Sequence, residues 1–299
     1  MGVGQSVLSS HELILIAIAT IMGTLARVFV LKVDYRQYPS YPNGYMIHIV
    51  TGFISASLGA VAIPAIMSKN YTAVTFLALA LTQFRDVRKT EKDSLKELEN
   101  TEFTPRGDAY IDGIAKSFES RNYLALIIAI SAGITIEVLK DFGDTIGSIS
   151  GVIVSALLFY YISQFSKGKT VGEIAIISLG QITVKESNLY VDEIFISNLV
   201  GTDNAEKMLI EEGVAVLIEP REEHFSITLD NFGQRKAVLF EATRSLGVKR
   251  YHFTRKDFAS GKTVIVFVPI IKDMDKLIRT IKNTPLLESV KKSHSIMSR

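Results

Sequence analysis

Three polar side chains lie within or beside long apolar stretches of this chain: Arg27, His48 and Glu137. A charged or titratable group in an apolar span costs free energy, and such groups commonly mark an ion or substrate path. We expect Arg27 and His48 to lie at one depth near the inner surface of a membrane. Glu137 falls near the outer surface, too far away to pair with Arg27. The three residues are therefore candidates for groups that line a pore or a cavity.

Each of these residues also has a purely structural alternative. The long side chain of Arg27 can reach the inner lipid head groups. His48 can hydrogen-bond to a neighbouring helix, and Glu137 can be solvated beside Lys140. Three scattered groups do not resemble the proton relay of a pump.

No set of side chains indicates catalysis or metal binding. The chain has no Cys, which excludes thiol nucleophiles, thiolate metal sites and disulfides. Residues 168–170 and 261–263 both read Gly-Lys-Thr, but each lacks the first glycine of a phosphate-binding loop. Glu222, Glu223 and His224 are adjacent, which is typical of a solvated turn and not of a metal site. We expect no enzyme activity, no catalytic residue, no metal and no cofactor.

Arg27, His48 and Glu137 belong to a region of five apolar stretches, residues 1–162, which we take as a transmembrane domain. About 20 apolar residues cross a bilayer core, so the stretches predict a multi-pass α-helical membrane bundle. The predicted helices lie near residues 13–31, 45–67, 71–87, 123–139 and 145–162, with a cytoplasmic insertion at 85–122. A kinked or re-entrant unit around Pro64 is an alternative for residues 52–84.

Basic residues in the joints between the stretches indicate the orientation of such a bundle. Lys32 and Arg36 follow the first stretch, and the segment 85–122 is rich in Lys and Arg. Lys167 and Lys169 follow the last stretch. This distribution places the N-terminus outside and the C-terminal domain in the cytoplasm. We expect a multi-pass protein of the cell membrane, in contact with membrane lipids.

Small residues recur at every fourth position in two of the stretches, and small side chains let helix backbones approach closely. The two helix-packing stripes are Gly52, Ala56 and Ala60, and Gly147, Gly151 and Ser155. Packing inside one bundle explains such stripes, and so does contact between copies of the chain. The second explanation predicts a homo-oligomer.

Residues 163–299 have the pattern of a soluble domain, with β-branched strands, helices and turns in alternation. Strands are predicted at 214–219, 225–229, 263–270 and 287–296, and helices at 234–245 and 273–282. This order predicts a cytoplasmic α/β or α+β domain, with a ferredoxin-like fold as one option. The net charge of +2 does not favour a nucleic-acid partner.

One short run in the cytoplasmic insertion resembles a known signature. Residues 109–115 read Ala-Tyr-Ile-Asp-Gly-Ile-Ala, which is similar to the sequence for which the YIEGIA family of membrane proteins is named. Asp112 stands where that family usually has Glu. The resemblance implies a membrane complex linked to sporulation in endospore-forming bacteria, with a small capping subunit as a partner. It selects the coupling or interface candidates Tyr110, Ile111, Asp112, Gly113, Ile114 and Ala115.

Together these observations favour an oligomeric membrane protein associated with sporulation, in the forespore or spore inner membrane. The leading hypothesis is a channel or pore that is gated or capped through the cytoplasmic domain. A non-conducting scaffold for assembly of the spore envelope is the alternative. A membrane enzyme is disfavoured, because no cluster of carboxylates or histidines lies at suggestive spacing.

Overall fold

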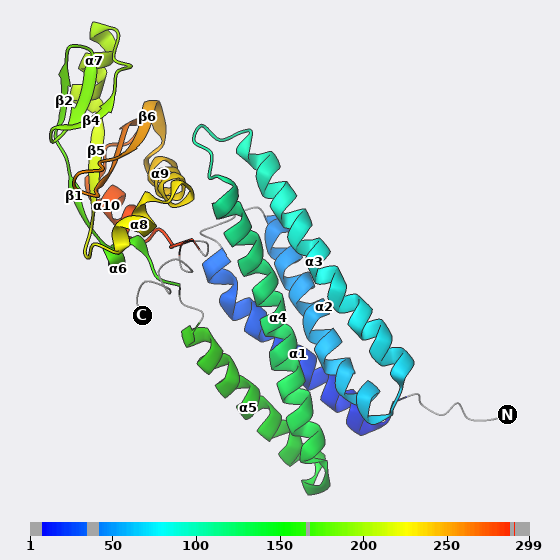
Figure 1. Cartoon of the computed structure of the whole chain (residues 1–299). Helices are drawn as coiled ribbons and strands as arrows, with labels where there is room; N and C mark the ends of the chain where they lie inside the picture. Colours follow the sequence, from blue (N-terminus) through cyan, green and yellow to red (C-terminus); the bar gives the residue numbers. More distant parts are fainter. Residues whose placement is uncertain (1–7, 35–41, 166–167, 288–289, 291–299) are drawn as a thin grey trace. The chain divides into compact units, whose positions relative to one another are not determined.

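A computed structural model describes residues 8–34, 42–165, 168–287 and 290 (Figure 1). The side chains at 31–34, 42–45, 84–85 and 165 lie outside this description. The chain divides into two compact units. Unit 1 comprises residues 1–92 and 114–167, and unit 2 comprises residues 93–113 and 168–299.

Long helices make up unit 1, and two of them continue into unit 2. The helices are α1 (Ser10–Asp34), α2 (Pro42–Met67), α3 (Tyr71–Glu99), α4 (Asp108–Val138) and α5 (Asp144–Phe165), with a short 3₁₀ turn η1 (Lys140–Phe142). Four spans within the described residues are long and apolar enough to cross a membrane, namely Ser10–Val30, Met46–Met67, Asp108–Val138 and Asp144–Gln164.

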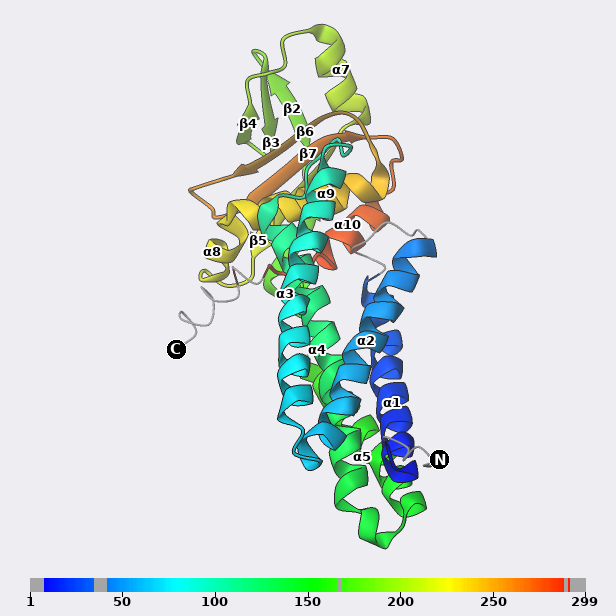
Figure 2. The same cartoon turned by 90° about the vertical axis from the view of Figure 1, so that its right-hand side faces the viewer.

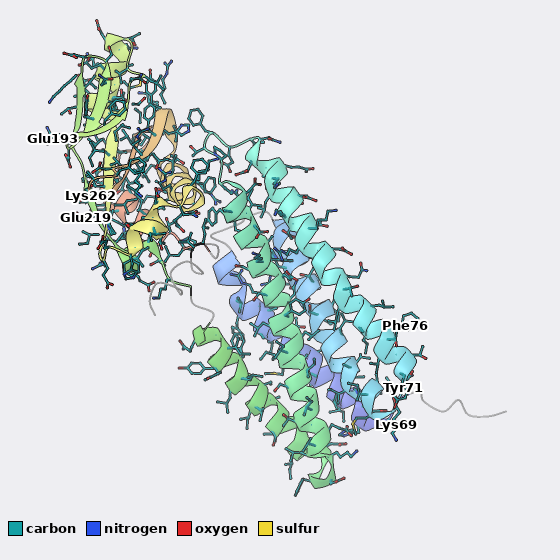
Figure 3. The ribbon with its side chains drawn as sticks, viewed as in Figure 1. Lys69, Tyr71, Phe76, Glu193, Glu219 and Lys262 are labelled. Carbon is teal, nitrogen blue, oxygen red and sulfur yellow. The ribbon has the colours of Figure 1, made fainter. Side chains whose placement is uncertain are left out.

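The predicted membrane helix at 71–87 is not among these four. Its residues belong to α3, which runs without a break to Glu99. The apolar start of α3, residues 71–84, is about 14 residues or roughly 21 Å long, which is short of the 30 Å bilayer core. Tyr71 and Phe76 in this part project outward from the helix, with exposed fractions of 75% and 68% (Figure 3).

Glycine and alanine form the contact between α1, α2 and α4. A Cβ added at Gly23 would lie 2.5 Å from the carbonyl oxygen of Ala125 and 2.7 Å from the Cβ of Ala56. Real Cβ atoms do not approach that closely, so these positions require their small residues. The buried cluster at this contact consists of Ala19, Ala56, Ala60, Ala129 and Ala132.

Unit 2 contains two antiparallel sheets (Figure 2). The first has the order β1-β5-β7-β6, with β1 (Ala175–Leu179), β5 (Val214–Pro220), β7 (Thr263–Pro269) and β6 (Val248–Lys256). The second has the order β2-β3-β4, with β2 (Ile182–Lys185), β3 (Asn188–Val191) and β4 (Ile194–Ser197). Glu219 of β5 and Lys262, which precedes β7, form an ion pair of 3.1 Å (Figure 3).

The four-stranded sheet is covered on both faces, because its strands alternate between two apolar clusters. Val216 and Phe267 point to a cluster shared with α9 and α10. Leu217 and Val266 point to the opposite cluster, which is shared with β3, β4 and α7. Unit 2 is therefore a layered α+β fold, and its central strands β5 and β7 are apolar and buried over residues 214–218 and 264–268.

Short helices complete unit 2, and most begin at a recognisable cap. They are α6 (Val171–Ile174), α7 (Asp203–Glu212), α8 (Phe225–Asp230), α9 (Phe232–Leu246) and α10 (Met274–Lys282). The N-cap side chains of Thr202, Asn231 and Asp273 accept hydrogen bonds from the first turns of α7, α9 and α10. Gly247, with φ of 71°, follows the end of α9.

The predicted strands at 214–219 and 263–270 and the predicted helices at 234–245 and 273–282 are confirmed. The predicted strand at 225–229 is wrong, because these residues form α8. Phe225, Thr228 and Leu229 are buried at the spacing of a helix. The predicted strand at 287–296 lies largely outside the described residues.

Candidate functional site

Arg27 and His48 meet in unit 1. Arg27 of α1 is fully buried, and its Nη2 lies 3.3 Å from Nδ1 of His48 on α2. A guanidinium only donates hydrogen bonds, so Nδ1 of His48 is the acceptor. The Phe118 ring of α4 lies 4.9 Å from the imidazole and 5.3 Å from the guanidinium carbon, measured between centres. The sequence analysis selected two members of this cluster and missed Phe118.

Gly52 makes room for Arg27. A Cβ added at Gly52 would lie 2.4 Å from Cγ and 2.8 Å from Cβ of Arg27. These atoms belong to the stem of the side chain, which cannot move far. The first residue of the α2 stripe thus accommodates a buried arginine, whereas Ala56 and Ala60 contribute to the alanine cluster.

The second stripe packs inside the chain. A Cβ at Gly151 of α5 would lie 2.7 Å from Cγ1 of Ile136 and 3.1 Å from the carbonyl oxygen of Ala132. Gly147 also lies against Ile136, and Ser155 is fully buried. Both stripes therefore serve contacts within unit 1.

Glu137 belongs to an ionic network at the end of α4. It lies 19 residues beyond Phe118 of the Arg27 cluster on the same helix. Its Oε2 lies 3.2 Å from Nε2 of His11, and its Oε1 accepts a hydrogen bond of 2.7 Å from Lys140. Nδ1 of His11 lies 2.6 Å from Asp144. Histidine thus bridges two carboxylates and ties the starts of α1 and α5 to the end of α4. The sequence analysis identified Lys140 but not His11.

Tyr110, the first candidate of the coupling segment, is anchored within unit 2. Its hydroxyl donates a hydrogen bond of 2.5 Å to Oε1 of Glu241 on α9. Its ring meets Phe240 edge-on, with centroids 6.2 Å apart. Arg106, only 2% exposed, places its guanidinium 4.8 Å from the centre of the same Phe240 ring. We call Arg106, Tyr110, Phe240 and Glu241 the α4–α9 clamp.

The glycine that permits this approach is on α9. A Cβ added at Gly233 would lie 2.8 Å from the Cβ of Ala109. Gly113, by contrast, has no atom within 4 Å of an added Cβ, so a close helix contact does not explain it. Ile111, Ile114 and Ala115 are buried. The border between the units falls after Gly113, so the 109–115 segment lies where α4 passes from unit 2 into unit 1.

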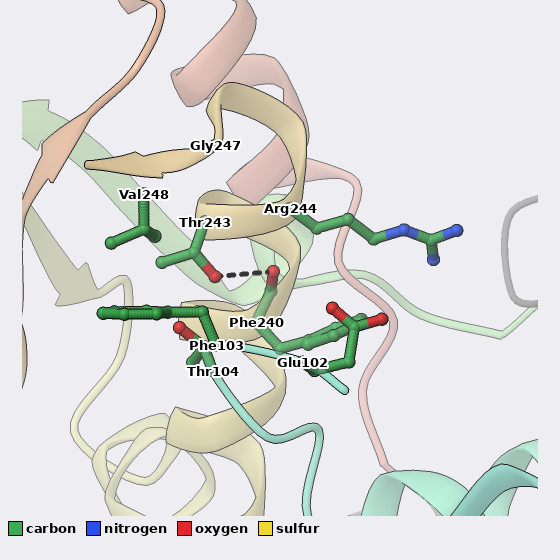
Figure 4. Close-up of a pocket in the computed structure, with 8 residues that line it drawn as sticks. All are labelled: Glu102, Phe103, Thr104, Phe240, Thr243, Arg244, Gly247 and Val248. Carbon is green, nitrogen blue, oxygen red and sulfur yellow. Dashed lines mark hydrogen bonds between the residues drawn. The ribbon is translucent and has the colours of Figure 1, made fainter. Parts of the chain in front are cut away.

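A cavity of about 230 Å³ lies beside the clamp in unit 2 (Figure 4). Its walls combine aromatic, aliphatic, hydroxyl and charged side chains, namely Glu102, Phe103, Thr104, Phe240, Thr243, Arg244 and Val248, together with Gly247. The Thr243 hydroxyl donates to the carbonyl of Phe240 (Figure 4). The Phe103 ring also meets His252 of β6 edge-on at 5.3 Å. At about 230 Å³, the cavity is smaller than the roughly 300–1,000 Å³ of typical ligand pockets, and it has room for a single side chain.

Within the described residues, no three histidines or carboxylates converge as ligands for a metal ion. The described residues contain two candidate functional sites, one in each unit. Unit 1 holds a buried arginine–histidine cluster between apolar helices. Unit 2 holds the start of α4 against α9 beside a cavity.

Apolar helices long enough to cross a membrane, joined to an antiparallel α+β unit, define the class of this chain. The chain belongs to the YIEGIA family, because the family described as "YIEGIA protein" matches residues 15–296. It is similar to the "Uncharacterized protein YphB" of Bacillus subtilis (strain 168), with 33% identity over 276 residues and 90% of each chain covered. No solved structure matches. The family assignment from residues 109–115 is confirmed.

Substitution of two glycines by alanine is expected to have opposite effects. Gly52→Ala should destabilise unit 1 by about 1–3 kcal/mol, because the new methyl overlaps the stem of Arg27. Gly113→Ala should stabilise the chain by up to about 1 kcal/mol, because alanine is the better helix former and the space is open. Thermal unfolding of the purified full chain measures both. Equal shifts for the two variants would contradict the packing described for Gly52.

The Tyr110–Glu241 hydrogen bond is expected to couple the two residues energetically. Tyr110→Phe and Glu241→Gln should each destabilise unit 2, and the double variant should cost less than the sum. A coupling free energy of about 1.5–3 kcal/mol is expected for a hydrogen bond to a charged acceptor. Chemical denaturation of the four proteins of this cycle gives the value. If the two single-variant losses of unfolding free energy simply add up in the double variant, Tyr110 and Glu241 do not stabilise each other.

His252 is expected to make stability depend on pH. Burial disfavours its charged form and lowers its pKa below the ordinary value for histidine, which is about 6.5. The unfolded chain then binds the proton more readily, so this residue should reduce stability as pH falls from 7 to 5. His252→Phe keeps a ring against Phe103 and should flatten that part of the pH dependence. Melting temperatures of both proteins at pH 7.5 and 5.0 test this, and parallel curves would refute it.

Proposed function

We propose that this chain is a multi-pass membrane protein of endospore-forming bacteria, with its N-terminus outside and unit 2 in the cytoplasm. Four apolar helices support the membrane assignment. Apolar side chains on their outer surfaces support it too: Phe29 is 68% exposed and Leu157 is 63% exposed, as expected of residues that face lipid. The basic residues between the apolar stretches support the orientation.

The sheet order supports a ferredoxin-like core in unit 2, rearranged along the chain. The strands β5 and β6 run parallel and are joined through α9, with β7 between them, which is a split β-α-β unit. In our proposal β1 takes the edge position that the last strand of such a fold usually occupies. The segment β2–β4 with α7 is then an insertion between β1 and β5.

In function, we propose a membrane-anchored docking scaffold for a complex that forms during sporulation. Unit 2 receives a protein partner, and α4 carries the effect of docking to the membrane helices. The observation that carries this proposal is the α4–α9 clamp, because the signature segment of the family begins at the Tyr110–Glu241 hydrogen bond. A single helix, α4, then continues from the clamp through the bundle to Val138.

Packing in unit 1 favours a scaffold over a pore within one chain. The alanine cluster and the close approach at Gly23 fill the space between α1, α2 and α4. Arg27 is buried against Phe118 and His48, so it does not line an open path along the axis of one bundle. A channel of this protein would need several copies, and the small-residue stripes are already used within the chain.

Exchange of the Bacillus subtilis gene for YphB by the gene for this chain provides a test in cells. Arg106→Ala combined with Tyr110→Phe opens the clamp, and we expect the yield of heat-resistant spores to fall at least tenfold. The protein should remain in the membrane fraction after carbonate washing. Phe258→Ala is the matched control, because this aromatic residue is 84% exposed and outside the clamp. A normal spore yield with an opened clamp would reject the coupling role.

Flux measurements separate the scaffold from the pore. The full chain reconstituted in liposomes should pass no more ions than empty liposomes do. A sustained ion flux that the Arg27→Ala variant abolishes would refute the scaffold hypothesis and favour a channel built from several copies of the chain.

A further inference from the structure

The cavity of unit 2 has an exposed rim and a buried wall (Figure 4). Phe103 lines the cavity and is 62% exposed, so its ring marks the opening to solvent. Thr104 and Phe240 also line the cavity, but they are only 5% and 1% exposed. A side chain that enters beside Phe103 therefore reaches a buried wall, which the segment between α3 and α4 forms together with α9.

The buried wall carries a hydroxyl group that makes no hydrogen bond. Within the described residues, Oγ1 of Thr104 is buried and has no hydrogen-bond partner. The hydroxyl of Thr243, by contrast, already donates to the carbonyls of Leu239 and Phe240 in its own helix. A buried polar atom without a partner is unfavourable. An occupant of the cavity that hydrogen-bonds to Thr104 therefore removes this cost.

The size and lining of the cavity select the kind of occupant. An apolar cavity of about 150 Å³ holds a benzene ring, and this cavity has about 230 Å³. It has room for an aromatic ring with a small substituent. Phe103 and Phe240 provide aromatic walls, against which another ring packs favourably. A phenol combines such a ring with a hydroxyl group that both donates and accepts hydrogen bonds.

Apolar surface next to the cavity favours a protein as the source of the phenol. A Cβ added at Gly247, which lines the cavity, would lie 2.8 Å from Cδ1 of Ile270. Ile270 is 68% exposed, and its neighbour Ile271 is 56% exposed. Exposed apolar side chains beside a pocket are typical of protein interfaces, in which tyrosine is a common anchoring residue.

We propose that the cavity binds the side chain of a tyrosine from a protein partner. Its ring packs against Phe103 and Phe240, and its hydroxyl group hydrogen-bonds to Thr104. Ile270 and Ile271 extend the contact beyond the cavity. This inference rests on the proposed docking function, and it names the site on unit 2 and the residue that the partner contributes.

Methyl NMR of the purified full chain in detergent tests the site. The probes are N-acetyl-tyrosinamide and N-acetyl-phenylalaninamide, which differ by one hydroxyl group. The methyl signals of Val248 report binding, because Val248 lines the cavity. The tyrosine probe should shift these signals and bind at least threefold more tightly than the phenylalanine probe, as a neutral hydrogen bond provides. Equal affinity of the two probes, or no shift with the tyrosine probe, would overturn the proposal.

Two threonine variants assign the difference between the probes to Thr104. Thr104→Val keeps the shape of the side chain and removes its hydroxyl group, so the tyrosine probe should lose its threefold advantage while the phenylalanine probe binds as before. Thr183→Val makes the same change on β2, outside the cavity, and should leave both affinities unchanged. An advantage of the tyrosine probe that survives in Thr104→Val would refute the hydrogen bond to Thr104.

Two further results would assign the cavity to another occupant. Binding of p-cresol, the free side chain, without binding of N-acetyl-tyrosinamide would indicate a small phenol. Self-association of the full chain that N-acetyl-tyrosinamide reverses would indicate a tyrosine from a second copy. Either result would overturn the assignment to a separate protein partner.

The cavity and the docking function fail in different measurements. If the tyrosine probe does not bind, the inference about the cavity is wrong, and the spore yield of the clamp variant still decides the docking function. If the tyrosine probe binds with the expected preference but the clamp variant gives a normal spore yield, the tyrosine site is supported and the coupling role is rejected.

Discussion

The structure depends on one constraint: α4 must satisfy two different surroundings along a single uninterrupted helix. Its first turns carry Tyr110, whose hydroxyl needs the Glu241 acceptor once it is buried. Its later turns carry Ala125 and Ala129, which lie within about 3 Å of a Cβ added at Gly23 of α1. The same helix therefore contributes a hydrogen-bonded aromatic residue to unit 2 and small packing residues to unit 1.

Three neighbouring residues allow unit 1 to hold the buried Arg27. Gly52 leaves space for the aliphatic stem, Phe118 lies against the guanidinium, and His48 accepts a hydrogen bond. Each of these contacts reduces the cost of a charge in apolar surroundings. The small residues of α2 thus have two purposes, close backbone approach and accommodation of a polar side chain, and neither requires a second copy of the chain.

In the four-stranded sheet, uniform burial made the central strands predictable, and mixed burial hid an edge strand. The central strands β5 and β7 are apolar on both faces, so a continuous apolar run indicated them. The edge strand β6 was missed, because Lys249, Arg250, Arg255 and Lys256 hide its pattern. The run at 225–229 has the composition of a strand, but its buried residues follow the period of a helix.

The amino-acid sequence was sufficient to predict the division into apolar helices and a polar α+β region, the family, and the candidate residues Arg27, His48 and Tyr110. These follow from composition, period and a local signature. The partners of these side chains became known from the folded chain: Phe118 for Arg27, His11 for Glu137, and Glu241 for Tyr110. These partners lie 91, 126 and 131 positions away along the chain, and no pattern in one sequence encodes which distant helices pack together.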